Sequence, residues 1–330
     1  MILNPGIISL ISASFFVVAF AAYASVIGVQ ILRWWDLRSG SRRQLVLEKK
    51  TYLVSTIFTC VLIFQLLSLL LYVYTADHIH ILFVGAMCAA GALNANDFGY
   101  PTLVLKVVDF VLCGIWIIVN HVDNKAVDYP LIRFKYKLLI LIACLLTLEA
   151  FLQTRYFMAL RADIITSCCG ALFSVDAESI AGEMAALPHR ITRILFFISV
   201  MLTIRVGIHV LVKGKGAGLY GILSVWLMMF SMASIVSFIS VYYYELPTHH
   251  CPFCLLQRDY HAIGYPLYLS LLAGGIFGVS VGVLGRFKGI ESLRDTVPVF
   301  QKRLCVLSMS CFIIFVMISL YPMVFSDFVL

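Results

Sequence analysis

Charged residues are scarce in this chain of 330 residues. Asp, Glu, Lys and Arg make up 12% of it, about half the share in an average soluble domain, and 62% of the residues are hydrophobic. A soluble enzyme, a nucleic-acid reader and a disordered scaffold are therefore excluded, because none of them keeps so much apolar surface out of water. The net charge of +7 is read as a guide to membrane topology, and we expect no nucleic-acid partner.

Two cofactor motifs are also missing from the sequence. The chain lacks a Walker A motif, which leaves ATP hydrolysis without support. It lacks the C-x-x-C-H motif of covalent c-type haem, because Leu255 rather than histidine follows Cys254. No linker rich in Pro, Gly or Ser divides the chain. We therefore expect residues 1–330 to form a single integral membrane domain.

Eight apolar runs have the length of about 20 residues that an α-helix needs to cross a bilayer. They are continuously apolar, which disfavours a β-barrel, whose strands alternate in polarity. The predicted fold class is all-α, a polytopic membrane helix bundle with about eight transmembrane helices. The predicted spans are 7–32, 51–74, 101–120, 137–154, 191–212, 217–243, 262–285 and 304–326.

Positive charge gathers in every second connection between these spans. The loops 33–50, 121–137, 213–216 and 286–303 together carry 17 of the 24 Lys and Arg residues. By the positive-inside rule these loops face the cytoplasm, so both termini face outward. If the cell is bacterial, this predicts an inner-membrane protein whose outward segments face the periplasm. These outward segments are about 76–100, 155–190 and 244–261.

The ten cysteines divide by side of the membrane. Five lie within predicted spans, where free cysteine usually packs as a small hydrophobe, and none lies in a cytoplasmic loop. An exported compartment is oxidising, so thiols exposed there pair, bind metals or do redox chemistry. The five outward cysteines are Cys88, Cys168, Cys169, Cys251 and Cys254.

The most specific element is the run HHCPFCLLQR at residues 249–258. A C-x-x-C pair such as Cys251 and Cys254 suits thiol–disulfide exchange, since its first sulfur is readily activated. A position at the start of an outward-facing helix would direct the positive end of the helix dipole at the sulfurs. His249 and His250 would also favour the thiolate. The alternative is a disulfide that only staples the loop.

The spacing of Cys251, Cys254 and Arg258 resembles the C-x-x-C-x-x-x-R of disulfide bond formation protein B, a relative of the vitamin K epoxide reductases. The resemblance covers about ten residues. It implies that Cys251 and Cys254 pass electrons to a membrane quinone, with Arg258 near the quinone head group. It also implies a second outward pair that exchanges disulfides with an exported thioredoxin-like or other thiol protein. The adjacent Cys168 and Cys169 are the candidates.

Tyrosines cluster at the outer boundary around this motif. Tyr242 to Tyr244, Tyr260, Tyr265 and Tyr268 fit an interfacial aromatic belt. The belt is the favoured explanation, and the flat rings of Tyr260 and Tyr265 would also suit a bound quinone.

Metal binding is the main rival to redox chemistry. Cysteine and histidine together are the ligands of zinc and copper, and Met87 beside Cys88 adds a soft pair suited to Cu(I). His249, His250 and Cys88, with Cys251 and Cys254, would then hold copper or zinc. A third alternative is a non-enzymatic membrane subunit of a larger complex.

Acidic and basic residues meet in two neighbouring apolar spans. Lys106 and Asp109 lie three apart in the third span, and Glu149 lies in the fourth. Charges at such depth are costly and usually pair or line a wet cavity. The simple interpretation is a Lys106–Asp109 ion pair. The sharper one adds Glu149 and makes the three residues a proton relay for thiol or quinone chemistry.

The sequence thus favours a membrane thiol–disulfide oxidoreductase that couples an exported dithiol partner to a membrane quinone. Copper or zinc handling and a purely structural role stay open as alternatives. Whether the chain is an enzyme is therefore undecided at this point.

Overall fold

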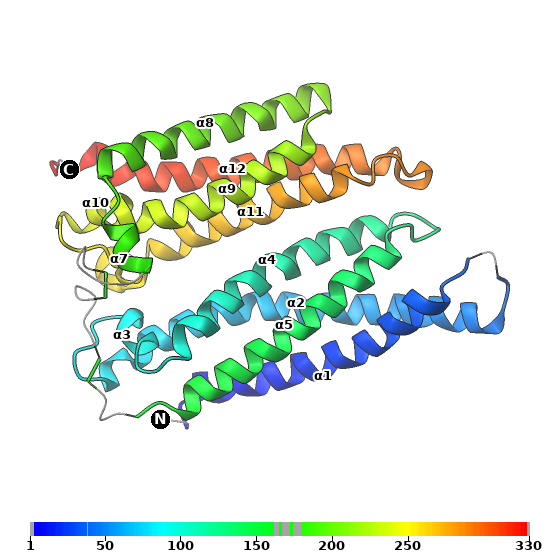
Figure 1. Ribbon diagram of the computed structural model, residues 1–330, viewed down its shortest axis with the longest axis horizontal. Coiled ribbons are helices and arrows are strands. Elements are labelled where there is room, and N and C mark those ends of the chain that lie inside the picture. Colours follow the sequence, from blue (N-terminus) through cyan, green and yellow to red (C-terminus); the bar gives the residue numbers. More distant parts are fainter. Residues whose placement is uncertain (1–2, 38, 162–164, 167–171, 174–179, 329–330) are drawn as a thin grey trace. The chain divides into compact units, whose positions relative to one another are not determined.

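The structure is a computed structural model that describes residues 3–37, 39–161, 165–166, 172–173 and 180–328. These residues form helices joined by loops and contain no β-strand (Figure 1). Eight of the helices are long and apolar enough to cross a bilayer, which confirms the predicted all-α membrane bundle. The chain is an integral membrane protein.

The helices reach beyond the predicted apolar runs at most of their ends. The largest extension is in α2, which begins nine residues before the predicted span, because backbone hydrogen bonding continues into a polar flank. The helices are α1 (Pro5–Trp34), α2 (Arg42–Ile79), α3 (Ala89–Leu93), α4 (Gly99–Asp123), α5 (Ile132–Met158), α7 (Ile180–Ala185), α8 (His189–Lys213), α9 (Ala217–Ser234), the π-helix Ile235–Ile239, α10 (Ser240–Tyr244), α11 (Gly264–Gly285) and α12 (Thr296–Phe325).

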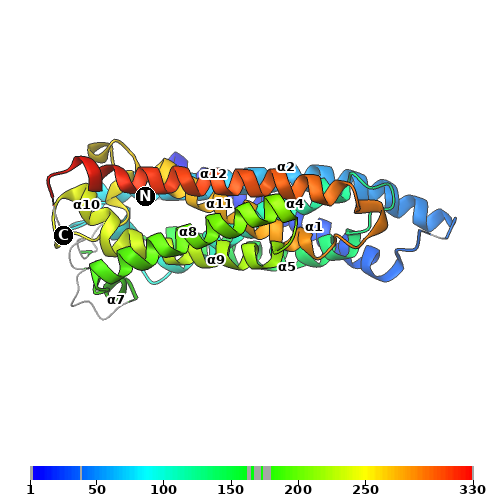
Figure 2. The ribbon, with the colours of Figure 1, turned by 90° about the horizontal axis from the view of Figure 1, so that it is seen from above.

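Two compact units make up the predicted membrane domain. Unit 1 comprises Met1–Thr75, Asn96–Arg161 and Gly289–Val297. Unit 2 comprises Ala76–Ala95, Ala162–Lys288 and Pro298–Leu330. Within each unit the long helices run alongside one another, as Figure 2 shows from a second direction. Each unit therefore has a helical interior of its own.

Unit 1 is built around α5, against which both α1 and α4 pack. Aromatic side chains fill its core: the rings of Phe58 and Trp116 meet edge to face at 5.1 Å between centroids. The Trp116 indole donates a hydrogen bond of 3.0 Å to the carbonyl of Lys135, so the buried ring has its polar partner.

An ion pair closes the connection between α4 and α5. Lys135 Nζ lies 2.7 Å from Asp123 Oδ2, and both side chains are fully buried. The other carboxylate oxygen, Oδ1, accepts a hydrogen bond of 2.8 Å from the Leu131 amide. Asp123 therefore fixes both the loop and the start of α5.

Unit 2 is built around α9, which packs against α8 on one side and α11 on another. Small residues let α9 and α11 approach each other closely. A Cβ atom added to Gly221 would lie 3.0 Å from the Gly282 Cα, and one added to Gly278 would lie 2.1 Å from Ser224 Oγ. Such glycine contacts are typical of helix packing in membranes, where van der Waals contact drives association.

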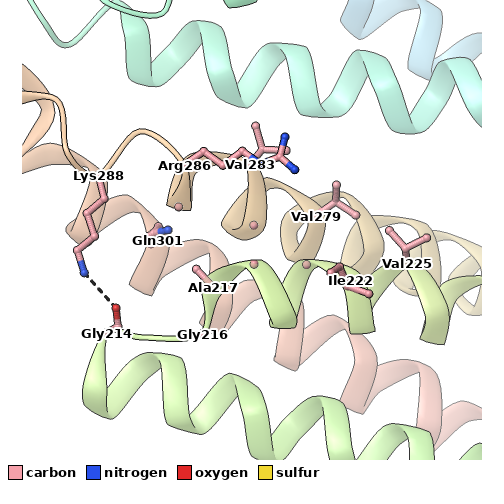
Figure 3. A pocket seen from close by; sticks show the side chains of 14 residues that line it. Gly214, Gly216, Ala217, Ile222, Val225, Val279, Val283, Arg286, Lys288 and Gln301 are labelled. Atoms are coloured by element: carbon pink, nitrogen blue, oxygen red, sulfur yellow. Dashed lines mark hydrogen bonds between the residues drawn. The ribbon is translucent and has the colours of Figure 1, made fainter.

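A glycine-lined cavity of about 510 Å³ lies where α9 begins and α11 ends (Figure 3). Cys251 and Cys254 precede the opposite end of α11. Lys288 Nζ donates a hydrogen bond of 3.0 Å to the Gly214 carbonyl across the rim of the cavity. Gln301, from α12, lines the cavity and donates to the Val281 carbonyl. These contacts join the turn before α9 to the end of α11.

Candidate metal centre

Two segments of unit 2, far apart in the sequence, bring three cysteines together. Cys88 is the residue before α3, whereas Cys251 and Cys254 belong to the cysteine loop, residues 245–263, between α10 and α11. The Cys88 and Cys251 sulfurs are 3.6 Å apart, and all three sulfurs lie within 4.8 Å of one another. The exposed fractions are 0% for Cys88 and Cys251 and 5% for Cys254, so the cluster is closed to solvent.

A tight turn positions Cys88. Gly85 has a φ of +89°, and a Cβ atom there would lie 2.5 Å from the Thr166 carbonyl oxygen, so this turn requires glycine. The Thr166 amide donates a hydrogen bond of 2.9 Å to the Val84 carbonyl. Asp77 accepts a bond of 3.3 Å from the Ala89 amide and so caps α3 directly after Cys88.

Two tyrosines hold the backbone of the C-x-x-C motif. The Tyr244 hydroxyl donates a hydrogen bond of 2.6 Å to the Cys251 carbonyl, and the Tyr268 hydroxyl donates one of 2.7 Å to the Pro252 carbonyl. These tyrosines come from α10 and α11, the helices that flank the cysteine loop. Their hydroxyl groups therefore fix the backbone that carries the Cys251 side chain into the cluster.

A third contact joins the two segments directly. Gln257 Nε2 donates a hydrogen bond of 2.7 Å to the carbonyl of Met87, the neighbour of Cys88. The Met87 side chain is 64% exposed, so this contact lies at the surface of the protein.

The prediction that a helix dipole acts on the cysteine sulfurs is wrong. Cys254 begins a 3₁₀ helix of three residues, and α11 begins at Gly264, ten residues further on. The dipole of a helix acts within its first turn, which lies outside the C-x-x-C motif. A Cβ atom on Gly264 would meet the Leu255 backbone at 3.0 Å, so the loop folds back over the start of α11.

The cluster of the described residues contains no histidine. His250 is buried, and its Nδ1 lies 3.0 Å from the Val236 carbonyl oxygen of the π-helix. Its ring stacks on that of His189 at 5.8 Å between centroids, while the His249 ring meets Tyr244 at 4.6 Å. The sequence predicts His249, His250 and Cys88 as metal ligands beside the C-x-x-C pair, and among the described residues the structure gathers Cys88 alone with that pair.

The residues predicted to bind quinone do not line one common cavity. Tyr260 lines a cavity of about 790 Å³ whose walls include Tyr242 and other side chains of the same unit. Arg258 is exposed on the 3₁₀ helix Arg258–Tyr260, and Tyr265 lies in the first turn of α11. Neither is among the residues that line this cavity.

Tyr260 connects the cavity to the cysteine loop. Its ring meets that of Tyr244 at 4.7 Å between centroids, and Tyr244 holds the Cys251 carbonyl. Burial, followed by charge repulsion from Cys254 and Asp259, raises the pKa of the Tyr260 phenol. The phenol therefore stays neutral near neutral pH.

Several contacts around the cysteine cluster have no counterpart among the sequence predictions. The sequence assigns Tyr244 and Tyr268 to the aromatic belt, although the clustering of tyrosines around C-x-x-C is a usable signal for the bonds that they make. Nothing in the sequence marked Asp77 or Gln257. The predicted relay residues Cys168 and Cys169 lie outside the described residues.

Unit 1 contains the predicted intramembrane charges. Lys106 Nζ pairs with Glu149 Oε1 at 2.6 Å. The expected Lys106–Asp109 ion pair is absent from the ion pairs of the described residues, so the simple interpretation of these charges is wrong.

The dimensions of the three-cysteine cluster suit a metal ion. With metal–sulfur bonds of about 2.3 Å, as in zinc sites, sulfurs would be about 3.8 Å apart in a tetrahedral arrangement and about 4.0 Å apart in a trigonal one. The observed 3.6 Å and the limit of 4.8 Å bracket these values. The cluster can therefore hold a metal ion with only small movements of its side chains.

Comparison with known proteins gives no match: no protein-family model, no curated protein and no solved structure is significantly similar to the chain. The resemblance to disulfide bond formation protein B stays a prediction, and function has to be argued from the site itself.

Proposed function

We propose that this membrane protein binds a soft metal ion, Cu(I), through Cys88, Cys251 and Cys254, and that it handles copper at the outward side of the membrane. The observation that carries the proposal is the convergence of three buried sulfurs from two distant segments. Thiolates are soft ligands that select Cu(I) and Zn²⁺ over harder cations.

The number of ligands favours Cu(I) over Zn²⁺. Structural zinc sites are almost always tetrahedral with four protein ligands, commonly Cys and His. The cluster offers three sulfurs, and no histidine or carboxylate of the described residues belongs to it. A three-sulfur site suits Cu(I), which accepts trigonal thiolate coordination.

Burial bears on what the site does with its ion. A metal bound among buried sulfurs is shielded from oxidants and competing ligands, which suits a copper acceptor or a carrier that passes the ion to another soft site. The predicted orientation places the cluster on the outward face, where an exported protein would deliver or collect copper. A fixed membrane subunit of a larger complex would use the same site to store one ion.

The direct test is a Cu(I) competition titration of the full-length protein, purified without oxygen and reduced. We expect one equivalent of Cu(I) per chain, with strong binding lost in C88S, C251S and C254S. Cys305→Ser is the matched control, because Cys305 is a buried thiol of the same unit whose sulfur hydrogen-bonds the Gly207 carbonyl. X-ray absorption of the loaded protein should show three sulfur neighbours around copper.

Two results would overturn the copper proposal. One is unchanged Cu(I) affinity in all three cysteine variants. The other is four-coordinate zinc in the protein as purified, with an imidazole in its coordination shell.

Thiol–disulfide exchange is the second candidate, and the 3.6 Å contact between Cys88 and Cys251 favours it. If Cys251 and Cys254 form a disulfide, the Cys88 thiolate can attack the Cys251 sulfur. A Cys88–Cys251 bond then forms, and Cys254 leaves as a thiolate. No net electrons are transferred in this step, so it relays a disulfide within the site.

Net oxidation requires an electron acceptor, for which we propose a membrane quinone that takes two electrons and two protons. The cavity is lined by Tyr260, whose ring contacts that of Tyr244, the residue that bonds the Cys251 carbonyl, and its aromatic walls suit a quinone ring. Burial of the sulfurs counts against direct attack by a protein thiol, since exchange needs access. The test is quinone reduction by a small dithiol: turnover that C251S abolishes and C305S retains would support this candidate.

A further inference from the structure

A second buried polar cluster lies in unit 1, separate from the cysteines. Lys106 Nζ on α4 lies 2.6 Å from Glu149 Oε1 on α5 and donates a hydrogen bond of 2.8 Å to Ser68 Oγ on α2. Gln65, also on α2, donates a hydrogen bond of 2.6 Å to Glu149 Oε2. Both oxygens of Glu149 are therefore satisfied as acceptors.

Asp109 is the member of this cluster whose oxygens lack such partners. Its side chain is 0% exposed, and it interacts with the Glu149 carboxyl and, more weakly, with Lys106. Neither Asp109 oxygen receives a hydrogen bond from any described side chain or backbone amide. Two ionised carboxylates have no hydrogen to share, so a bond between Asp109 and Glu149 exists only when one of them carries a proton.

The cluster lies deep in the helical unit. With a rise of 1.5 Å per residue, Lys106 and Asp109 lie about 10 and 15 Å from the start of α4 at Gly99, and Glu149 lies about 14 Å from the end of α5 at Met158. The hydrocarbon core of a bilayer is about 30 Å thick, so helices that cross it would hold this cluster within the apolar layer. An uncompensated charge at such a depth is expensive.

The acids of this cluster outnumber its bases. Two acids, Asp109 and Glu149, face one base, Lys106, which leaves one negative charge in excess. Lys106 is the cation that these acids meet among the described residues. The other groups that face the pair, the Cys113 thiol and the Tyr72 ring 5.4 Å from Lys106 Nζ, bring no positive charge.

We propose that Asp109 and Glu149 share one bound proton, which makes unit 1 a proton-binding site in the membrane interior. The proton neutralises the excess charge and supplies the hydrogen bond between the two carboxyls. It resides mainly on Asp109, because Glu149 already accepts bonds from Lys106 and Gln65.

Infrared spectroscopy of the full-length protein in lipid nanodiscs tests this proposal, since a protonated carboxyl absorbs separately from a carboxylate. Near neutral pH we expect the band of one buried protonated acid, and Asp109→Asn should remove it. Lys106→Met should double the band, because the loss of the one cation forces a second acid to bind a proton. The proposal requires the band to disappear in D109N and to grow in K106M, whereas general structural damage would not change the band in opposite directions.

Asp123→Asn is the matched control. Asp123 is equally buried, but it pairs with Lys135, so its acid and base are equal in number and no proton is required. The band should therefore survive in D123N. A wild-type protein without the band, or a band that persists in D109N, overturns the proposal. A band that appears only after sodium is replaced by a bulky organic cation would also overturn it and identify a sodium site instead.

Discussion

The buried pair of Asp123 and Lys135 gives the sharpest test of how unit 1 is stabilised. Both side chains are 0% exposed, with 2.7 Å between Lys135 Nζ and Asp123 Oδ2. Lys135→Met keeps most of the apolar stem but removes the cation, so that the Asp123 carboxylate stays buried without its counter-charge. The replacement Asp123→Asn removes the other charge and keeps an oxygen for the hydrogen bond from Leu131.

The magnitude follows from burial. Removing one partner of a buried ion pair costs about 3–5 kcal/mol, because the desolvated charge left behind has no compensation. At 1.4 kcal/mol per tenfold change, this raises the equilibrium constant for unfolding by about two to four orders of magnitude. The double variant D123N/K135M has no buried charge at this position and retains the Leu131 bond, so we expect it to recover most of the loss.

The assay is reversible unfolding of the purified protein in mixed micelles, with the wild type, both single variants and the double variant forming a cycle. The two single variants together lose about 6–10 kcal/mol, so a double variant that recovers most of the loss gives a coupling energy of more than about 4 kcal/mol between the two positions, above the range usual for residues in contact. Single variants that lose less than about 1 kcal/mol, or losses that simply add in the double variant, would refute the assignment of a buried, solvent-excluded pair.

Four further outcomes follow from the structure. Gly278→Leu should separate α9 from α11 and sharply lower the melting temperature, whereas Gly218→Ala, where no atom lies within 4 Å of the added Cβ, should leave it unchanged or raise stability by up to about 1 kcal/mol. Gly85→Ala combines a positive φ with a contact of 2.5 Å and should weaken Cu(I) binding in the competition titration while the helical circular dichroism persists. Tyr268→Phe removes the bond to Pro252 and should weaken Cu(I) binding several-fold, matching a loss of about 1 kcal/mol. Cu(I) affinity should fall as pH is lowered, because the thiols must lose protons to bind; the same titration at several pH values measures this, and a flat profile would contradict thiolate ligation.

The spans were predictable because crossing a bilayer imposes one simple requirement, a long apolar helix. The ends of the helices were less predictable. Apolar runs measure the part of a helix that lipid or core covers, whereas α2 begins at Arg42 in a polar stretch that still forms backbone hydrogen bonds. The division into two units was not visible in the sequence, because it depends on which helices pack together rather than on a linker.

The sequence predicted the residue types of the candidate metal centre, but not which cysteines and histidines come together. The sequence placed Cys88 and the C-x-x-C pair in outward segments, yet 163 positions separate Cys88 from Cys251, and only folding shows that they meet. The neighbouring His250 looked like an equally good ligand. Its Nδ1 lies against the Val236 carbonyl instead, and local spacing could not reveal that a π-helix presents this acceptor.

The intramembrane charges show why local spacing alone chose the wrong ion pair. Lys106 and Asp109 are three residues apart, which places both on one face of α4 and makes a pair between them plausible. That same face packs against α5, where Glu149 is already oriented by Gln65 from α2. A carboxylate with two donors is better stabilised than one with a single donor, so Lys106 completes the set around Glu149 and Asp109 is left to be neutralised by a proton. By the same reasoning, Glu149→Gln should return Lys106 to Asp109 and abolish the protonated-acid band, so a band that survives in E149Q would contradict this order of preference.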